Sequence, residues 1–219
     1  GSIRLIDDDV PQQGPVEKWE ISDVAYTYGA GWYLFNWKDN ICQLNTTTCE
    51  TKPHTPDLKI ERHKSRRGTS IIRGFGSNLL NVYAPSTVRN NYVSSTMPYP
   101  WTAFEYALRK SLGDAGISIG RKYICGNEDD ADDVETIYSR YSPLRDTVLS
   151  SMMHRSDNMY AEGILRSFAP GEERSEALAK EMDLWKQRGI DMQYTTIWDG
   201  SGLTRANRIS PLTLGSILE

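Results

Sequence analysis

The sequence is poor in long apolar runs, in net charge and in cysteine, and each shortage excludes a class of protein. No segment approaches the roughly 20 apolar residues that a membrane-spanning helix needs, and no charged-then-apolar signal segment opens the chain. The net charge is −4, from 25 basic and 29 acidic residues. Such a balance does not indicate a protein that holds nucleic acid by phosphate contacts. We therefore expect no membrane span in this chain and no nucleic-acid partner.

Three cysteines leave at least one thiol unpaired, so cysteine content does not define a compartment. Cys42 and Cys49 could pair across a hairpin, but a single strand through both would hold them too far apart. That pairing stays open. No Cys-x-x-Cys or Cys/His spacing accompanies these residues, so we expect no metal and no cofactor.

The sequence has two clusters of like charge that could be binding sites, but both are better explained as solvated segments. The basic run 62–67 ("RHKSRR") is short and is expected to be a solvated loop. The acidic run from Glu128 to Glu135 lacks the alternating ligands and the turn glycine of a calcium loop. We interpret the acidic run as a linker between two parts of the chain.

The part before the linker has the pattern of short strands with one helix. Residues 24–50 predict a hairpin, with "GWYLFNW" and "ICQLNTTT" as its strands. Two further strands are expected in "TSIIRGF" and "NLLNVYA", and another in "ISIGRKYI". Apolar residues at helical spacing predict a helix over 101–112. We expect a strand-rich domain over 1–133, in which 51–92 can form a nested lobe.

The part after the linker changes to helical periodicity. Helices are predicted near 143–154, 158–168 and 176–188, and Ser210-Pro211 is expected to begin a last helix. Between them, "QYTTIWDG" predicts a strand that ends in a glycine-rich turn. The chain is therefore expected to be α+β, with residues 134–219 as a second domain.

Two segments of this second part carry polar groups that can do chemistry. Ser156-Asp157-Asn158 precedes a helix, where such residues are ordinary helix caps but can also face a substrate. The turn "DGSGLTRANRISP" follows about forty residues later. By itself it fits an ordinary connection, and it does not supply the Gly-x-Ser-x-Gly of a nucleophile elbow.

Together the two segments resemble the serine D-Ala-D-Ala carboxypeptidases, low-molecular-mass penicillin-binding proteins with domains inserted into a transpeptidase fold. The stretch "SPLRDTVLSSMMHRSDNMYAEGILR" is similar to that group's helix, Ser-x-Asn triplet and helix. "WDGSGLTRANRISP" is similar to its strand and turn, and "WEISDVAYTYGAG" with "WKDN" to the opening of its inserted domain. The resemblance covers nearly the whole chain.

The family's two other motifs are absent from the sequence. No Ser is followed three residues later by Lys, and neither Lys-Thr-Gly nor Lys-Ser-Gly occurs. In the family these motifs flank the part that this chain resembles. We therefore expect the chain to be a middle fragment of a longer enzyme, inactive by itself because it lacks the nucleophile. A degenerate homologue that lost both motifs is the less economical alternative.

The resemblance implies roles for the triplet. Family members attack the peptide bond between two D-Ala residues with a serine and hydrolyse the acyl-enzyme. Ser156 would relay a proton to the leaving group, and Asn158 would hold the substrate amide. Asp157 is expected to cap the helix.

The resemblance also implies a substrate pocket and a supporting turn. Asp23 and Tyr28 match positions that line a pocket for the peptidoglycan stem peptide, and Trp19 can join them. Core packing is the alternative for Tyr28 and Trp19, and a turn cap is the alternative for Asp23. The residues expected to hold the wall of the site, with Arg205 paired to a carboxylate, are Asp199, Gly200, Ser201, Gly202, Arg205 and Asn207.

The parent protein is thus expected to be a D-Ala-D-Ala carboxypeptidase or endopeptidase. Its expected partners are the peptidoglycan stem peptide and β-lactam antibiotics, and its expected place is the periplasm or another extracytoplasmic site at the cell envelope. The alternative from another class is a non-catalytic module that binds peptidoglycan or acts as a scaffold.

Overall fold

The computed structural model describes residues 2–6, 12–87, 91–119, 121–126, 135 and 138–219. It has the α+β architecture expected from the sequence, with eight strands and five α-helices in these ranges. The strands are β1 (Ser2–Ile6), β2 (Ile41–Asn45), β3 (Thr51–Lys52), β4 (Lys59–Lys64), β5 (Ser70–Arg73), β6 (Leu79–Ala84), β7 (Tyr92–Thr96) and β8 (Arg121–Gly126). The helices are α1 (Pro100–Asp114), α2 (Arg145–Arg155), α3 (Asn158–Arg166), α4 (Arg174–Gln187) and α5 (Pro211–Leu218), with single 3-10 turns at Thr27–Gly29 and Lys38–Asn40.

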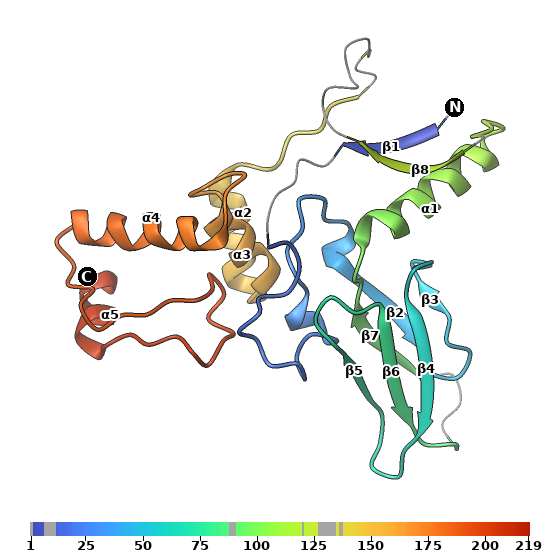
Figure 1. The fold of residues 1–219 in the computed structure, drawn as a ribbon, viewed down its shortest axis with the longest axis horizontal. Coiled ribbons are helices and arrows are strands. Elements are labelled where there is room, and N and C mark those ends of the chain that lie inside the picture. The colour runs from blue at the N-terminus through green and yellow to red at the C-terminus, as the bar shows by residue number, and fades with distance from the viewer. Residues whose placement is uncertain (1, 7–11, 88–90, 120, 127–134, 136–137) are drawn as a thin grey trace.

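Three small sheets form the strand-rich side of the molecule (Figure 1). β2 lies between β3 and β7 and pairs antiparallel with both. β6 lies between β4, its parallel partner, and β5, its antiparallel partner. β1 pairs parallel with β8. Helices α2 to α5 gather on the other side, and the segment 12–40 runs between the two groups (Figure 1).

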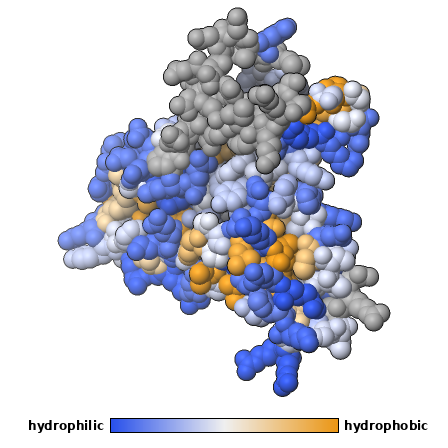
Figure 2. Space-filling model, turned by 45° about the vertical axis from the view of Figure 1, so that its right-hand side comes forward, coloured by the Kyte–Doolittle hydropathy of each residue, from blue (hydrophilic) through white to orange (hydrophobic). Residues whose placement is uncertain are grey.

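The main hydrophobic core belongs to the strand-rich side. It comprises Ala25, Cys42, Leu44, Leu58, Ile71, Leu80, Val82, Met97 and Ala103. The helical side has only a small core of Leu165, Ala169 and Ala177. On the face seen in Figure 2, hydrophilic side chains predominate and apolar patches lie between them.

Four predicted helices are found close to their expected ranges, and the Ser210-Pro211 start is confirmed. Ser210 Oγ accepts the Thr213 N–H at 3.0 Å, and Pro211 is the first helical residue. The predicted strands in "TSIIRGF" and "NLLNVYA" are present as β5 and β6. Part of "ISIGRKYI" lies in β8.

The predicted hairpin over 24–50 is wrong, because "GWYLFNW" forms no strand. Side-chain oxygens take the backbone N–H groups that a ladder would use: Asn36 Oδ1 accepts from Tyr33 N at 3.0 Å and Asn40 Oδ1 from Trp37 N at 3.0 Å. β2 instead pairs with β3 and β7. The aromatic side chains of this segment pack on α1 through Trp101 and Phe104.

Two further expectations are corrected. The basic run is not simply a loop, since Arg62, His63 and Lys64 end β4, whose charged residues suit a strand at the edge of a sheet. "QYTTIWDG" contributes only an isolated bridge between Thr196 and Arg208.

The acidic linker, apart from Glu135, and the expected boundary at 133/134 lie outside the described residues. The division into domains 1–133 and 134–219, with 51–92 as a nested lobe, stays a prediction. Cys42 and Cys49 are free thiols. No described helix is long and apolar enough to span a membrane.

Candidate functional site

The Ser156-Asp157-Asn158 triplet lies at the junction between α2 and α3. Ser156 follows the last residue of α2 in the left-handed region, with φ 52° and ψ 53°, which turns the chain sharply. Asp157 caps α3, since its Oδ1 accepts the Tyr160 N–H at 3.2 Å. Asn158 is the first residue of α3. The expected cap at Asp157 is confirmed, whereas the left-handed turn at Ser156 was not anticipated.

The triplet borders a pocket of about 230 Å³. Asn158 Nδ2 donates to the Tyr28 carbonyl oxygen at 2.8 Å, which ties α3 to the segment 27–30. The Ser156 side chain is exposed and makes no hydrogen bond to a described residue. The pocket is lined by Thr27, Tyr28, Ala30, Asp39, Ile41, Arg155, Ser156, Asp157 and Asn158. Ser156 and Asn158 therefore border one pocket.

A charged group flanks the triplet. The Arg155 guanidinium lies 3.5 Å from an Asp39 carboxylate oxygen and 3.3 Å from one of Asp157. Asp39 stands in a left-handed stretch in which Lys38, Asp39 and Asn40 have φ of 52°, 53° and 55°. The buried Asn40 anchors this stretch, because its Nδ2 donates to the Gly31 carbonyl at 2.9 Å. Consecutive left-handed residues are costly, so the anchor holds Asp39 at the pocket.

The expected substrate-binding residues separate into two places. Tyr28 lines the pocket, and its hydroxyl donates to Asp23 Oδ1 at 3.1 Å. Burial, followed by the hydrogen bond with Asp23, raises the pKa of Tyr28. Trp19 lies elsewhere: it is 3% exposed, and its indole N–H donates to Asp199 Oδ2 at 2.9 Å. Trp19 thus follows the core-packing alternative and supports the turn.

Asp199 is the centre of the glycine-rich turn. It is buried, and its Oδ1 accepts from Gly202 N at 3.0 Å and from Asn207 Nδ2 at 2.7 Å. Its Oδ2 accepts from Trp19 and from Thr204 N at 2.8 Å. A carboxylate that accepts several N–H groups fixes the shape of a turn. The sequence indicated this turn, but not the number of groups that converge on Asp199.

Glu162 is a site residue that the sequence reasoning missed. Its Oε1 accepts the N–H groups of Gly200 and Ser201, each at 3.0 Å, and its side chain is 1% exposed. Burial raises the pKa of Glu162 to about 7, and Asp199 adds to the rise while Arg174 opposes it. One signal was available: Glu162 is spaced three residues from both Met159 and Leu165, on the buried face of α3.

The turn and the triplet meet the same helix at different places. Gly200 lies so close to α3 that a Cβ would be 2.8 Å from the Ala161 carbonyl oxygen and 2.8 Å from the Leu165 Cβ. The turn does not line the pocket that the triplet borders. Arg205 pairs with Glu20 at 3.0 Å, as expected for a carboxylate partner, although both side chains are largely exposed.

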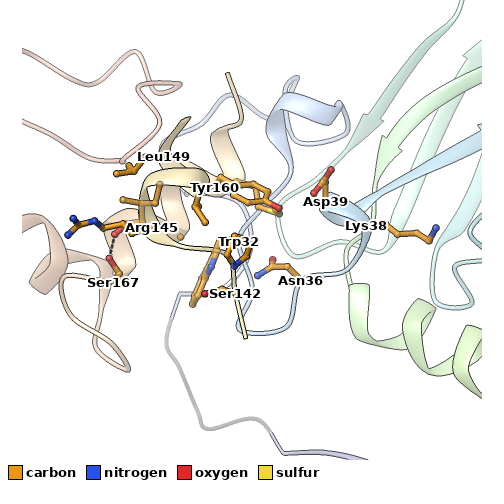
Figure 3. Close-up of a pocket in the computed structure, with 14 residues that line it drawn as sticks. Trp32, Asn36, Lys38, Asp39, Ser142, Arg145, Leu149, Tyr160 and Ser167 are labelled. Atoms are coloured by element: carbon orange, nitrogen blue, oxygen red, sulfur yellow. Dashed lines mark hydrogen bonds between the residues drawn. The ribbon is translucent and has the colours of Figure 1, made fainter. Parts of the chain in front are cut away.

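A larger pocket of about 590 Å³ lies beside the triplet, between α2, α3 and the segment 32–39 (Figure 3). Trp32, Leu149 and Tyr160 contribute apolar surface, and Asp39 borders this pocket as well as the smaller one. Ser167 Oγ donates to the Ile164 carbonyl at 2.6 Å at its edge. In the part of the chain that the structure describes, no group of three His, Cys, Asp or Glu residues is placed to hold a metal ion.

Comparison with known proteins places these features in a family. The model of the D-Ala-D-Ala carboxypeptidase 3 (S13) family matches residues 5–219. The D-alanyl-D-alanine carboxypeptidase DacB of Haemophilus influenzae is 39% identical over 83 residues, which is 35% of this chain and 17% of that protein.

Two solved structures share the fold. Penicillin-binding protein 4 (dacB) of Haemophilus influenzae superposes with a TM-score of 0.71 and 18% identity, over 100% of this chain and 52% of that one. A structure of the same protein, complexed with a novel β-lactam, gives a TM-score of 0.59 and 15% identity, over 90% and 49%. The chain thus spans about half the length of these solved chains.

Proposed function

The chain belongs to the D-Ala-D-Ala carboxypeptidase 3 (S13) family, and from that premise we propose that it is part of a serine-type enzyme that cleaves the terminal D-Ala-D-Ala bond of peptidoglycan stem peptides. The observation that carries the proposal is the Ser-x-Asn triplet, whose residues Ser156 and Asn158 line one pocket. Endopeptidase cleavage between stem peptides is the same chemistry on a longer substrate. The cell wall as substrate implies a place outside the cytoplasm.

In this proposal Ser156 relays a proton during acyl transfer and Asn158 orients the substrate amide. The junction supports both roles, because a left-handed residue and a helix start fix the two side chains two residues apart. Asn158 Nδ2 already donates to the Tyr28 carbonyl, so its conformation is set before a substrate arrives. Asp23 and Tyr28 are proposed to contact the stem peptide beside this pair.

The attacking serine and its activating lysine are proposed to come from a Ser-x-x-Lys sequence elsewhere in the full reading frame. No Ser of these 219 residues is followed three positions later by Lys. The 219-residue chain is accordingly expected to be inactive, since loss of the nucleophile removes nearly all covalent catalysis.

Labelled penicillin tests the proposal, because β-lactams acylate the nucleophile of such enzymes. We expect a mass spectrum of the protein from the full reading frame to show a covalent adduct, and that of the 219-residue chain to show none. An adduct on the 219-residue chain would contradict the assigned absence of a nucleophile. A full-length protein that binds peptidoglycan peptides, forms no adduct and releases no D-Ala would instead support the non-catalytic binding module.

A further inference from the structure

Glu162 is a buried carboxylate that the proposed acyl-transfer chemistry does not use. It lies four residues after Asn158, so the two side chains are on neighbouring turns of one face of α3. Its Oε1 accepts the amides of Gly200 and Ser201. Its Oε2 lies 3.5 Å from Arg174 Nε and accepts no hydrogen bond from a described residue. One side chain thus contacts α3, the turn and α4.

The contact between turn and helix is tight at this point. Gly200 has no room for a Cβ against Ala161 and Leu165, so the turn backbone lies directly on α3. Removal of the Glu162 carboxylate would leave the Gly200 and Ser201 amides facing a packed surface without an acceptor. Unpaired buried N–H groups are costly, so the turn would have to move.

Arg174 extends the same contact to the N-terminal segment. Its backbone N–H donates to Gln12 Oε1 at 3.0 Å, and its Nη2 donates to the Gln12 carbonyl at 3.2 Å. Its Nε has no hydrogen-bond partner in the described part of the chain and lies nearest Glu162. Arg174 is thus held by Gln12 on one side and faces the Glu162 carboxylate with its Nε on the other.

We propose that Glu162 is a positioning residue that fixes the Asp199–Thr204 turn to the helix carrying the Ser-x-Asn triplet, and that the protonation state of its carboxylate changes how the turn is held. The consequence for catalysis rests on the function proposed above, because the two segments are then parts of one enzyme site. The coupling itself is a property of the folded chain.

The surroundings of Glu162 explain why its protonation matters. The charged groups that face it are Arg174 from α4, Asp199 from the turn and Arg166 from its own helix. Burial raises the pKa of Glu162 to about 7, so both forms are populated near neutral pH. N–H groups bond more strongly to the ionised form, but that form also carries the cost of a buried charge.

Amide NMR of the 219-residue chain between pH 5 and 9 tests the proposal without any activity. We expect the Gly200 and Ser201 amide shifts to titrate with a midpoint near 7 in the wild type. Glu162→Gln keeps the shape but cannot ionise, so both shifts become flat, and Glu162→Asp restores a titration. Glu181→Gln is the control, because Glu181 is another carboxyl whose pKa burial raises, on α4. It leaves both titrations unchanged.

Hydrogen exchange gives the second measurement. In Glu162→Ala the Gly200 and Ser201 amides should exchange roughly tenfold faster or more, the scale of one lost hydrogen bond, while β6 amides keep their protection. Gly200 and Ser201 amide chemical shifts that still change with pH in Glu162→Gln, or that do not change with pH in the wild type, would overturn the role of protonation. Unchanged exchange in Glu162→Ala would overturn the positioning role. If that variant does not fold, the exchange of the same amides in Glu162→Asp decides, because its carboxylate is one methylene shorter and should protect them less than the wild type does. Penicillin acylation enters neither result, so the two proposals fail separately.

Discussion

The strand-rich side and the helical side of the molecule are held together by different means. The sheets enclose an apolar core, and the buried Arg73 on this side donates to Thr96 Oγ1 at 2.7 Å and to backbone carbonyls. The helical side has a core of three buried residues, and its turn is held by Asp199 and Glu162. The first side is stabilised mainly by packing, the second mainly by buried carboxylates that accept backbone N–H groups.

This difference suits the proposed site. The hydrophobic effect is non-directional, whereas hydrogen bonds to a carboxylate fix the positions of individual donor and acceptor atoms. Under the proposed function, the turn beside the Ser-x-Asn helix would need defined positions, because acyl transfer depends on geometry. A buried carboxylate that accepts several N–H groups provides such positions, but it makes this region sensitive to pH and to single substitutions.

Asp199→Ala should destabilise the helical side more than any other substitution considered below. It leaves Trp19 Nε1, Thr204 N and Gly202 N without their acceptor, so we expect a loss of about 4 kcal/mol in the free energy of unfolding. Urea denaturation measures it. Asp183→Ala is the control, since Asp183 is exposed and pairs with the neighbouring Lys186 on the same helix. Equal stability of the two variants would show that the turn does not depend on Asp199.

Leu80→Ala should weaken the other side by packing alone. Leu80 is fully buried in the strand-rich core, so the cavity should cost about 3 kcal/mol. The amide shifts of Gly200 and Ser201 should stay unchanged in the NMR spectrum. Shifts in the turn comparable to those around β6 would mean that the two sides are not separate in how they are stabilised.

The pH dependence of stability should reveal Glu162. Its folded pKa of about 7 lies above the ordinary 4.5, so the folded chain binds this proton more tightly than the unfolded chain. The stabilisation that this bound proton adds to the free energy of unfolding is therefore fully present below pH 4.5. It falls as the pH rises toward 7 and is absent above that value. The fall should be at most about 3 kcal/mol. Urea denaturation at several pH values should show this fall in the free energy of unfolding for the wild type and not for Glu162→Gln. A wild type that instead gained stability relative to Glu162→Gln between pH 4.5 and 7 would contradict the raised pKa.

Gly200→Ala should test the close approach of the turn to α3 without changing the charge on Glu162. The added methyl meets the Ala161 carbonyl oxygen and the Leu165 Cβ at 2.8 Å, so the turn must shift at a cost of about 2 kcal/mol. Gly202→Ala is a poor control because Gly202 has a φ of +74°, whereas Gly113→Ala meets nothing within 4 Å at ordinary φ. Thermal unfolding of Gly200→Ala and Gly113→Ala should therefore differ, and equal melting temperatures would argue against the tight contact.

Arg205→Ala should have the smallest effect on stability. Its side chain is 85% exposed and its partner Glu20 is 47% exposed, so solvent screens the pair. We expect at most about 0.5 kcal/mol in urea denaturation. A larger loss would mean that charge on the surface also holds the turn, which would weaken the distinction from the buried carboxylates.

The sequence predicted those parts of the fold that local chemistry determines. Helical spacing located α1 and α3, Asp157 and Ser210 were recognised as caps, and β5 and β6 were expected as two short strands. The prediction of a strand at 31–37 was wrong because the Asn36 and Asn40 side chains accept backbone N–H groups that a strand partner would need. Residue patterns do not show that side chains compete for these groups. β4 was missed because its charges resemble those of a loop.

The site shows the same limit. The triplet and Asp199 were visible as sequence motifs, but the role of Glu162 depends on amides 38 and 39 residues away. Trp19 likewise bonds to Asp199 across 180 residues, so its place in the turn could not be read from its neighbours. Motifs identified the triplet and the turn, and only the fold showed that Glu162 and Trp19 meet the turn.

Acylation kinetics of the full-length protein test the central claim most directly. Ser156→Ala and Asn158→Ala should each slow acylation by labelled penicillin by a factor on the order of 10² or more, the scale of a lost proton-transfer partner. Ser216→Ala, which replaces an exposed serine on α5 that donates to the Leu212 carbonyl, should react at the wild-type rate. Wild-type acylation rates in both triplet variants would contradict the role assigned to the Ser-x-Asn triplet.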